Sequence, residues 1–193
     1  MTATRDRIVD AAADLFRTHG YTGTGMKQVV AAAEAPFGSV YHFFPGGKQE
    51  LAAAAIERAG TFYGELVLAI LDAEDDVVVG TRAVFEGAGD VLVETGYADA
   101  CPIATVALEV ASTNEVLRAA CDRVFARWIE VLTERIAAGG APPAAARSAA
   151  IAVIGLLEGA FLLSRSARTT EAVRAMGDAA VATVAAAVGR PAV

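Results

Sequence analysis

Residues 25–48 read GMKQVVAAAEAPFGSVYHFFPGGK and contain two short apolar-periodic runs. The runs span residues 26–33 and 37–44, and the segment Glu34-Ala35-Pro36 separates them. Two helices of about two turns, joined by a turn of three or four residues, are typical of a helix-turn-helix. Pro36 suits the first turn of the second helix, where no N–H is needed, and Pro45 ends that helix.

The second short helix has a side that anchors it and a surface that is left for a partner. Val40 and Phe43 are three residues apart and share a face with Phe44 beside them, so we expect them to pack on a core. A helix of about eight residues is too short to be stable alone, so neighbouring helices must hold it. Its remaining surface carries Phe37, Gly38, Ser39, Tyr41 and His42. Hydroxyl, imidazole and lysine groups donate to phosphate oxygens, so we predict that this surface binds DNA.

The first fifty residues also share a set of spaced residues with a known family. The set consists of Ile8, Ala11, Ala12, Leu15, Phe16, Gly20, Tyr21, Thr24, Val29, Ala31, the block from Val40 to Pro45, and Lys48. On this spacing, residues 5–51 resemble the N-terminal domain of the tetracycline-repressor (TetR/AcrR) family of bacterial transcription regulators. The resemblance implies an all-α fold, with a three-helix DNA-binding head that contains the helix-turn-helix and a C-terminal helical domain that binds a ligand and dimerises.

The chain departs from the family pattern at two positions in the head. The turn between the two short helices usually carries a glycine, and this chain has Glu34 there. The residue before Gly38-Ser39 is often a lysine, and here it is Phe37, which removes a phosphate or base contact. The operator sequence therefore does not carry over from the family.

Nine residues are predicted to contact a pseudo-palindromic operator. Contacts to the DNA backbone are predicted for Thr24, Lys27, Tyr41, His42 and Lys48. Approach to base edges is predicted for Met26, Phe37, Gly38 and Ser39. Phe37 is a candidate for contact with a thymine methyl group.

Charge is distributed unevenly along the chain, whose formal net charge is −7. Residues 1–50 hold five Lys/Arg and five Asp/Glu, so they are neutral, whereas the remaining residues hold eleven and eighteen. An acidic chain is not expected to coat nucleic acid generally, so the motif carries the DNA-binding prediction. Hydrophobic residues make up 55% of the chain and alanine is frequent, which favours a mostly helical core.

The sequence also indicates a compartment and an absence of catalytic chemistry. Cys101 and Cys121 form no CxxC pair, which fits free thiols in a reducing cytosol. Charged residues near the start exclude a signal peptide, and Glu158 interrupts the most apolar stretch, residues 149–163. Neither cysteine has a sequence-near histidine or aspartate of a metal or catalytic site. We therefore expect a cytoplasmic protein that is not an enzyme and has no membrane span, metal or cofactor.

Periodicity and helix-stop residues predict about nine helices. The first is expected over 5–19, ended by Gly20 and followed by a loop over 21–25. After the two short helices, further helices are expected over 48–71, 78–95, 102–111, from a capping box of Ser112 and Glu115 to 138, 143–168, and from Thr169 or Thr170 to 188. We predict a DNA-binding domain over 1–47 and a ligand-binding and dimerisation domain over 48–193.

The last two helices are rich in small and apolar residues. Gly155 and Gly159 are four residues apart, which permits close helix approach. The last helix offers Ala180, Val181, Val184 and Val188 as an apolar surface. A symmetric four-helix interface in a homodimer would bury these residues, and a plain intramolecular core is the alternative.

Part of the C-terminal half resembles one branch of the same family. The matching residues are Cys101 to Ala104, Ala107 to Glu109, Trp128, and Leu157 to Ala160. They resemble the branch that includes lincomycin-resistance and flavonoid-responsive repressors. This resemblance implies repression of neighbouring genes and release of DNA on binding a small hydrophobic or aromatic effector.

Large side chains on different helices are candidates to surround that effector. We select Phe62, Leu66, Phe85, Trp128 and Phe161, with Glu158 for polar recognition. Ordinary core packing is the alternative for each aromatic residue, and a helix-edge or arginine-paired position is the alternative for Glu158. The resulting hypothesis is a ligand-responsive repressor. Its rivals are an activator or global regulator of the same fold, and a helical small-molecule-binding protein whose head no longer binds DNA.

Overall fold

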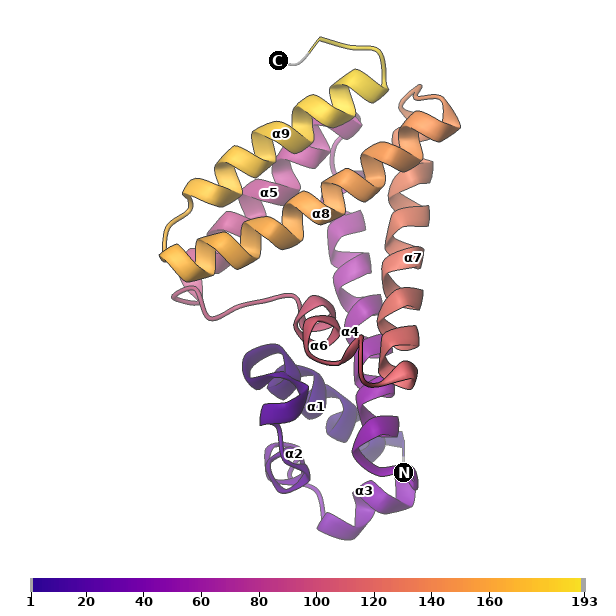
Figure 1. The fold of residues 1–193 in the computed structure, drawn as a ribbon, viewed down its shortest axis with the longest axis vertical. Helices are drawn as coiled ribbons and strands as arrows, with labels where there is room; N and C mark the ends of the chain where they lie inside the picture. The colour runs from indigo at the N-terminus through magenta and orange to yellow at the C-terminus, as the bar shows by residue number, and fades with distance from the viewer. Residues whose placement is uncertain (1, 192–193) are drawn as a thin grey trace. The chain divides into compact units, whose positions relative to one another are not determined.

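The computed structural model describes residues 2–191, and this range contains nine helices and no strand (Figure 1). The helices are α1 (Thr2–Gly23), α2 (Met26–Ala32), α3 (Phe37–Phe43), α4 (Gly47–Asp72), α5 (Val77–Glu94), α6 (Pro102–Val110), α7 (Glu115–Ala138), α8 (Pro143–Ala167) and α9 (Glu171–Ala187). The all-α prediction is therefore confirmed, and most helix ends lie within two residues of those expected.

The chain divides into two compact units, each of which is discontinuous in sequence. Unit 1 comprises the residues up to Tyr63 together with Ala100–Phe125. Unit 2 comprises Gly64–Asp99 together with the residues from Ala126 onward. Helices α4 and α7 thus contribute to both units. The units group residues by contact, so the functional division at residues 47 and 48 stays a prediction.

Unit 1 holds the helix-turn-helix against α1. The stripe Ile8, Ala12 and Phe16 of α1 is fully buried, as its spacing predicts. Val40 and Phe44, four residues apart, are also buried, whereas Phe43 is only partly buried. The anchor of α3 is therefore the i, i+4 pair rather than the i, i+3 pair.

Unit 2 is built largely on α5, α8 and α9, and Figure 1 shows α8 and α9 lying side by side. Its packing is close at Gly177, where an added Cβ would lie 2.9 Å from the Cβ of Phe85. In the part of the chain that the structure describes, α8 is the one helix long and apolar enough to cross a membrane. Core helices of globular domains pass the same test, and α8 places Ala146, Ala150 and Ala160 in the core.

The start of the chain differs from the expected helix and loop. Helix α1 begins at Thr2, and helical structure continues to Gly23 past a break at Gly20, where φ is 72° and ψ is 174°. The loop expected over 21–25 is therefore reduced to Thr24 and Gly25. Gly20 changes the direction of the helix instead of ending it, because a glycine adopts positive φ without a Cβ clash.

The expected capping box at Ser112 is wrong. Helix α7 begins at Glu115, and Asn114 precedes it with its side-chain Oδ1 accepting from the Leu117 N–H at 3.1 Å. The same oxygen accepts from Nε2 of Gln49 at 2.8 Å. Asparagine is as good an N-cap as serine, and the cross-helix bond to α4 favours it here. Pro36 likewise precedes α3 as its N-cap residue, outside the first turn.

Glu34, in the turn between α2 and α3, adopts a left-handed conformation with φ of 48°. We expect Glu34→Gly to raise the free energy of unfolding by about 0.5–1 kcal/mol. Relief of roughly 1–2 kcal/mol of left-handed strain outweighs the greater entropy that glycine gives the unfolded chain. Urea denaturation at fixed protein concentration measures the change. Glu34→Ala is the control because it keeps the Cβ, and an equal gain in both variants would contradict the backbone explanation.

Candidate nucleic-acid interface

The helix-turn-helix is joined to α1 by hydrogen bonds of the segment that precedes it. The hydroxyl of Thr24 donates to the carbonyl of Gly20 at 2.8 Å and lies 3.2 Å from that of Leu15. The Gly25 N–H then donates to Oε1 of Gln28 at 2.6 Å, which fixes the first turn of α2. The Thr24 side chain is 1% exposed, so contact with a DNA phosphate requires it to change partners.

Helix α3 presents an exposed surface opposite its anchor. Phe37 is 47% exposed and Tyr41 is 50% exposed, and their rings meet edge to face with centroids 5.7 Å apart. Gly38 is exposed, and nothing lies within 4 Å of the position that its Cβ would take. His42 is exposed and Ser39 is half-buried. The helix therefore combines apolar and hydrogen-bonding groups on a surface that another molecule can reach.

The two predicted contact residues of α2 differ in exposure. Lys27 is exposed, so its ammonium group is accessible to solvent, and Met26 is half-buried. The base-edge and backbone roles assigned to them stay predictions.

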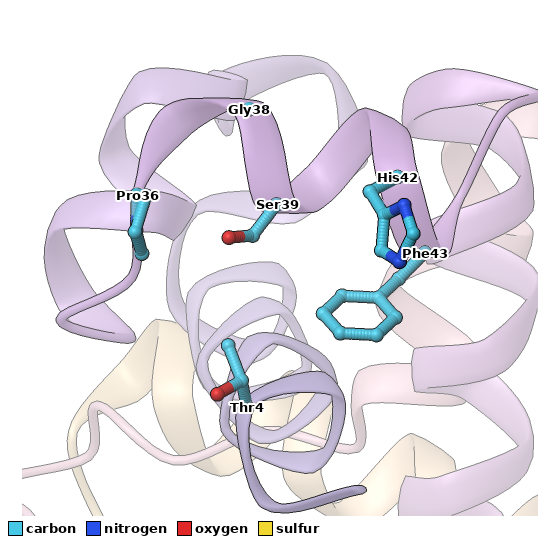
Figure 2. A pocket seen from close by; sticks show the side chains of 6 residues that line it. All are labelled: Thr4, Pro36, Gly38, Ser39, His42 and Phe43. Atoms are coloured by element: carbon cyan, nitrogen blue, oxygen red, sulfur yellow. The ribbon is translucent and has the colours of Figure 1, made fainter. Parts of the chain in front are cut away.

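An open hollow of about 510 Å³ lies between α3 and the beginning of α1. Figure 2 shows its lining residues, which are Thr4, Pro36, Gly38, Ser39, His42 and Phe43. Thr4 is the residue of this group that the sequence pattern missed, because it precedes the first predicted helix. The hollow brings three of the predicted DNA-contact residues together on one side of α3.

Lys48 lies in a different environment from the one expected of a free phosphate-binding lysine. Its Nζ is 4.4 Å from the ring centroid of Tyr21, in a cation–π arrangement. Burial lowers the pKa of Lys48 from its ordinary value, while the carboxylate of Glu109 acts in the opposite direction. Glu109 itself accepts hydrogen bonds from the backbone N–H groups of Tyr21 and Thr22.

Two further cations of the head come from α1. The guanidinium of Arg5 lies 5.2 Å from the ring centroid of Phe44, and Nε of Arg7 donates to the Ala33 carbonyl at 3.1 Å. Both residues are exposed. Arg5 and Arg7 were not predicted as contact residues because they lie outside the helix-turn-helix motif, although their charges are visible in the sequence.

The residues predicted to bind an effector occupy different environments. Phe62 is 60% exposed, and Leu66 is also exposed. Phe85 is fully buried in the core of unit 2, and Phe161 is partly buried against the same core. Trp128 and Glu158 are half-buried. An effector-binding role for these residues stays a prediction.

The residues predicted at a dimer interface also divide into two groups. Ala180, Val181 and Val184 are buried within unit 2, as the intramolecular alternative requires. Gly155 is exposed with open space beside it, whereas Gly159 lies near the Met176 side chain and Val188 is half-buried. The exposed apolar residues of α8 are instead Ile151, Leu162 and Leu163.

The two cysteines differ in burial. Burial raises the pKa of Cys121 to about 11, so its thiol stays protonated at neutral pH, and its Sγ lies 3.7 Å from the carbonyl oxygen of Ile103. Cys101 is half-buried at the start of α6. Within residues 2–191, no group of three or more His, Cys, Asp or Glu side chains is arranged to hold a metal ion.

Comparison with known proteins matches both halves of the chain. The model of the bacterial regulatory proteins of the tetR family matches residues 8–55. The model of the C-terminal domain of LmrA/YxaF-like transcriptional regulators matches residues 78–179.

The similarity to individual relatives covers most of the chain. The HTH-type transcriptional regulator LmrA of Bacillus subtilis is 31% identical over 166 residues, which cover 86% of this chain and 88% of LmrA. An uncharacterized HTH-type regulator of Mycobacterium tuberculosis is 34% identical over 175 residues, covering 87% of each chain. The structure of reduced NemR from Escherichia coli has a TM-score of 0.78 at 24% identity and covers 98% of this chain and 100% of that chain.

Proposed function

The chain belongs to the TetR family of bacterial transcription regulators, whose members bind operator DNA as dimers, and from this we propose that it is a ligand-responsive repressor. Helix α3 enters a major groove of the operator in each protomer. Tyr41, His42 and Lys27 contact the DNA backbone, and Phe37, Gly38 and Ser39 approach base edges.

The exposed surface of α3 is the observation that carries this proposal. Val40 and Phe44 fix the helix to the core, and Phe37 and Tyr41 are left half-exposed on its outer side. Large aromatic side chains lose apolar burial when they remain in water, so their exposure on a firmly held helix indicates a partner. DNA provides such a partner, because thymine methyl groups accept apolar contacts and phosphates accept hydroxyl donors.

Replacement of Tyr41 tests the proposal. The purified protein is first used to select duplexes from a random-sequence DNA pool. Tyr41→Ala is expected to weaken affinity for the selected duplex about tenfold, because it removes a phosphate donor and an aromatic contact. Val116→Ala is the control, since Val116 is an exposed apolar residue of unit 1 that lies on α7 rather than on α3.

The salt dependence of binding and the selection of duplexes can each give a result that contradicts the proposed DNA binding. Binding through phosphates weakens as the salt concentration rises, so the affinity is measured at two ionic strengths. If no sequence is enriched, the second candidate becomes the better proposal, a helical small-molecule-binding protein whose head does not bind DNA. Two features favour that candidate. Residues 1–50 have no net charge, and Phe37 stands where the family often has a lysine.

We further propose that a small hydrophobic or aromatic effector releases the operator. Phe62, Leu66, Trp128 and Phe161 are the candidate contact residues, with Glu158 for a polar group of the effector. Binding shifts the population toward a dimer geometry in which the two α3 helices no longer match two half-sites. Equal DNA affinity for the dimer in the presence and absence of every bound compound would contradict this mechanism.

The proposed dimer interface uses the outer faces of α8 and α9. Ile151, Gly155 and Leu162 follow i, i+4 and i+11 spacing, so they share one face of α8, and each is exposed. On α9 the exposed alanines Ala175, Ala179 and Ala186 have similar spacing. A smooth surface of small and apolar residues suits the close approach of helices from two protomers.

A further inference from the structure

The chain after Gly20 is bonded to a carboxylate from a distant part of the sequence. The non-helical conformation of Gly20 separates the turn that begins at Tyr21 from the preceding part of α1. The N–H of Tyr21 donates to Oε1 of Glu109 at 3.1 Å, and the N–H of Thr22 donates to Oε2 at 2.8 Å. Glu109 lies on α6, and both helices belong to unit 1. One carboxylate therefore serves as an N-terminal cap for the turn that begins at Tyr21.

The approach of this carboxylate depends on the absence of a side chain at residue 20. A Cβ on Gly20 would lie 1.7 Å from Oε1 and 2.8 Å from Cδ of Glu109. Glu109 therefore occupies the space that any other residue at position 20 would fill. A side chain at position 20 would therefore displace the carboxylate from the position in which it accepts both hydrogen bonds.

Lys48 and Tyr21 complete the same cluster. The Nζ of Lys48 is 4.4 Å from the centroid of the Tyr21 ring, and the Tyr21 ring is 5.8 Å from that of Phe16. The negative charge of Glu109 acts on Lys48, which is in the first turn of α4. Residues of α1, α4 and α6 are thereby held around one backbone turn.

That turn leads directly into the helix-turn-helix. Thr24 is fully buried and donates its hydroxyl to the carbonyl of Gly20, and its N–H donates to that of Tyr21 at 3.3 Å. Gly25 follows as the N-cap residue of α2. A change in the bonding of residues 21 and 22 therefore alters the path by which the chain enters α2.

We propose that Glu109 is a positioning residue for DNA binding, which sets the orientation of α2 and α3 by capping the turn after Gly20 without touching DNA. The proposal rests on the proposed function. It assigns a part of operator recognition to α6, outside the segment 8–55 that matches the family's DNA-binding model.

The direction in which Glu109→Gln changes the DNA affinity separates a positioning role from a purely electrostatic one. Loss of any negative charge near DNA strengthens binding to phosphates, so a Glu109 with no positioning role gives tighter binding when it becomes glutamine. Positioning predicts the reverse for Glu109→Gln. Glu115→Gln is the matched control, because Glu115 is an exposed carboxylate of the same unit that bonds its neighbour Arg118.

The experiment measures the affinities of full-length variants for two labelled duplexes, one selected from a random pool by the wild-type protein and one unrelated. Glu109→Gln is expected to bind the selected duplex about tenfold more weakly, which corresponds to one lost charge-assisted interaction. Its affinity for the unrelated duplex is expected to stay equal or to rise. Partial unfolding would lower both affinities together, so the ratio of the two is the readout specific to positioning.

A second variant and a hydrogen-exchange measurement complete the experiment. Glu109→Asp retains the charge but shortens the side chain, and it is also expected to lower the affinity ratio. Amide hydrogen exchange at Tyr21 and Thr22 is expected to accelerate in both variants and to stay unchanged in Glu115→Gln. An unchanged ratio in a folded Glu109→Gln variant would overturn the proposal. Failure of the wild-type protein to select any duplex would instead refute the proposed function.

Discussion

Gly20→Ala is expected to lower the free energy of unfolding by about 4 kcal/mol. Two effects combine in this number. An alanine at φ of 72° and ψ of 174° is held in a region that costs roughly 1–3 kcal/mol. Its Cβ also displaces the Glu109 carboxylate, which would otherwise lie 1.7 Å away, so two charge-assisted hydrogen bonds worth about 1.5–3 kcal/mol are lost.

Gly23→Ala provides a control for this prediction within the same helix. Its φ is not positive, and an added Cβ would make an ordinary contact at 3.7 Å with the Cβ of His19. Alanine is a better helix former than glycine, so this variant is expected to be neutral or slightly stabilised. Urea denaturation of both variants at one protein concentration measures the difference. Equal stability of the two variants would show that neither the strain nor the clash at Gly20 exists in solution.

Gly60→Ala is expected to lower the free energy of unfolding by about 3 kcal/mol. Gly60 lies on α4 in unit 1, and a Cβ there would be 2.5 and 2.6 Å from the two methyl carbons of Val124 on α7. Val124 is fully buried, and a β-branched side chain in a helix has one strongly preferred rotamer, so it cannot turn aside. Relief of this clash requires α4 and α7 to move apart, which disturbs the packing of the core around them.

A double-mutant cycle with Val124→Ala tests the cause of this loss. Val124→Ala alone is expected to destabilise by about 2 kcal/mol through a cavity. In Gly60→Ala/Val124→Ala the new methyl group occupies space that the valine has left, so the combined loss is expected to be about 2 kcal/mol below the sum of the single losses. Simple additivity would mean that the valine methyl groups do not cause the loss. Gly87→Ala serves as the control, because its Cβ would meet only Cδ1 of Ile70 at 3.9 Å.

Local sequence signals predicted the helices well where a single residue decides an end. Pro102 and Pro143 begin α6 and α8, and the glycines after Ala138 lie directly beyond α7, because proline and glycine act through their own backbone geometry. Pro45 likewise follows α3, whereas Pro36, which was expected in the first turn of that helix, is its N-cap residue. These effects need no knowledge of the rest of the fold, so the sequence alone suffices for them.

Local sequence signals did not predict contacts between residues that are far apart in the chain. Asn114 caps α7 in place of Ser112, and part of its advantage is the bond from Gln49, which is 65 residues away. The cation–π contact of Lys48 with Tyr21 and its electrostatic interaction with Glu109 were not predicted either, while its predicted phosphate contact stays a prediction. Periodicity reports which face of a helix is apolar, but it does not say which other helix will cover that face.

The apolar residues of α9 illustrate this last point. Ala180, Val181 and Val184 form a stripe that an intramolecular core and a dimer interface would bury equally well. In the structure this stripe faces the core of unit 2, and the opposite face of α9 carries the exposed alanines. A helix with small residues on both sides gives no periodic signal that distinguishes the two faces.

The discontinuity of unit 1 has a consequence for how such regulators diversify. A gene fragment that ends at Tyr63 omits Val106, Leu117 and Val124, which are completely buried in unit 1. Its product would expose their partners and would lack the cap that Glu109 provides. Two separate stretches of the gene therefore encode the core of unit 1, because α6 and the first half of α7 complete it. Exposed positions of α3 bear no such constraint, so point substitutions there offer lineages a simpler route to new operators.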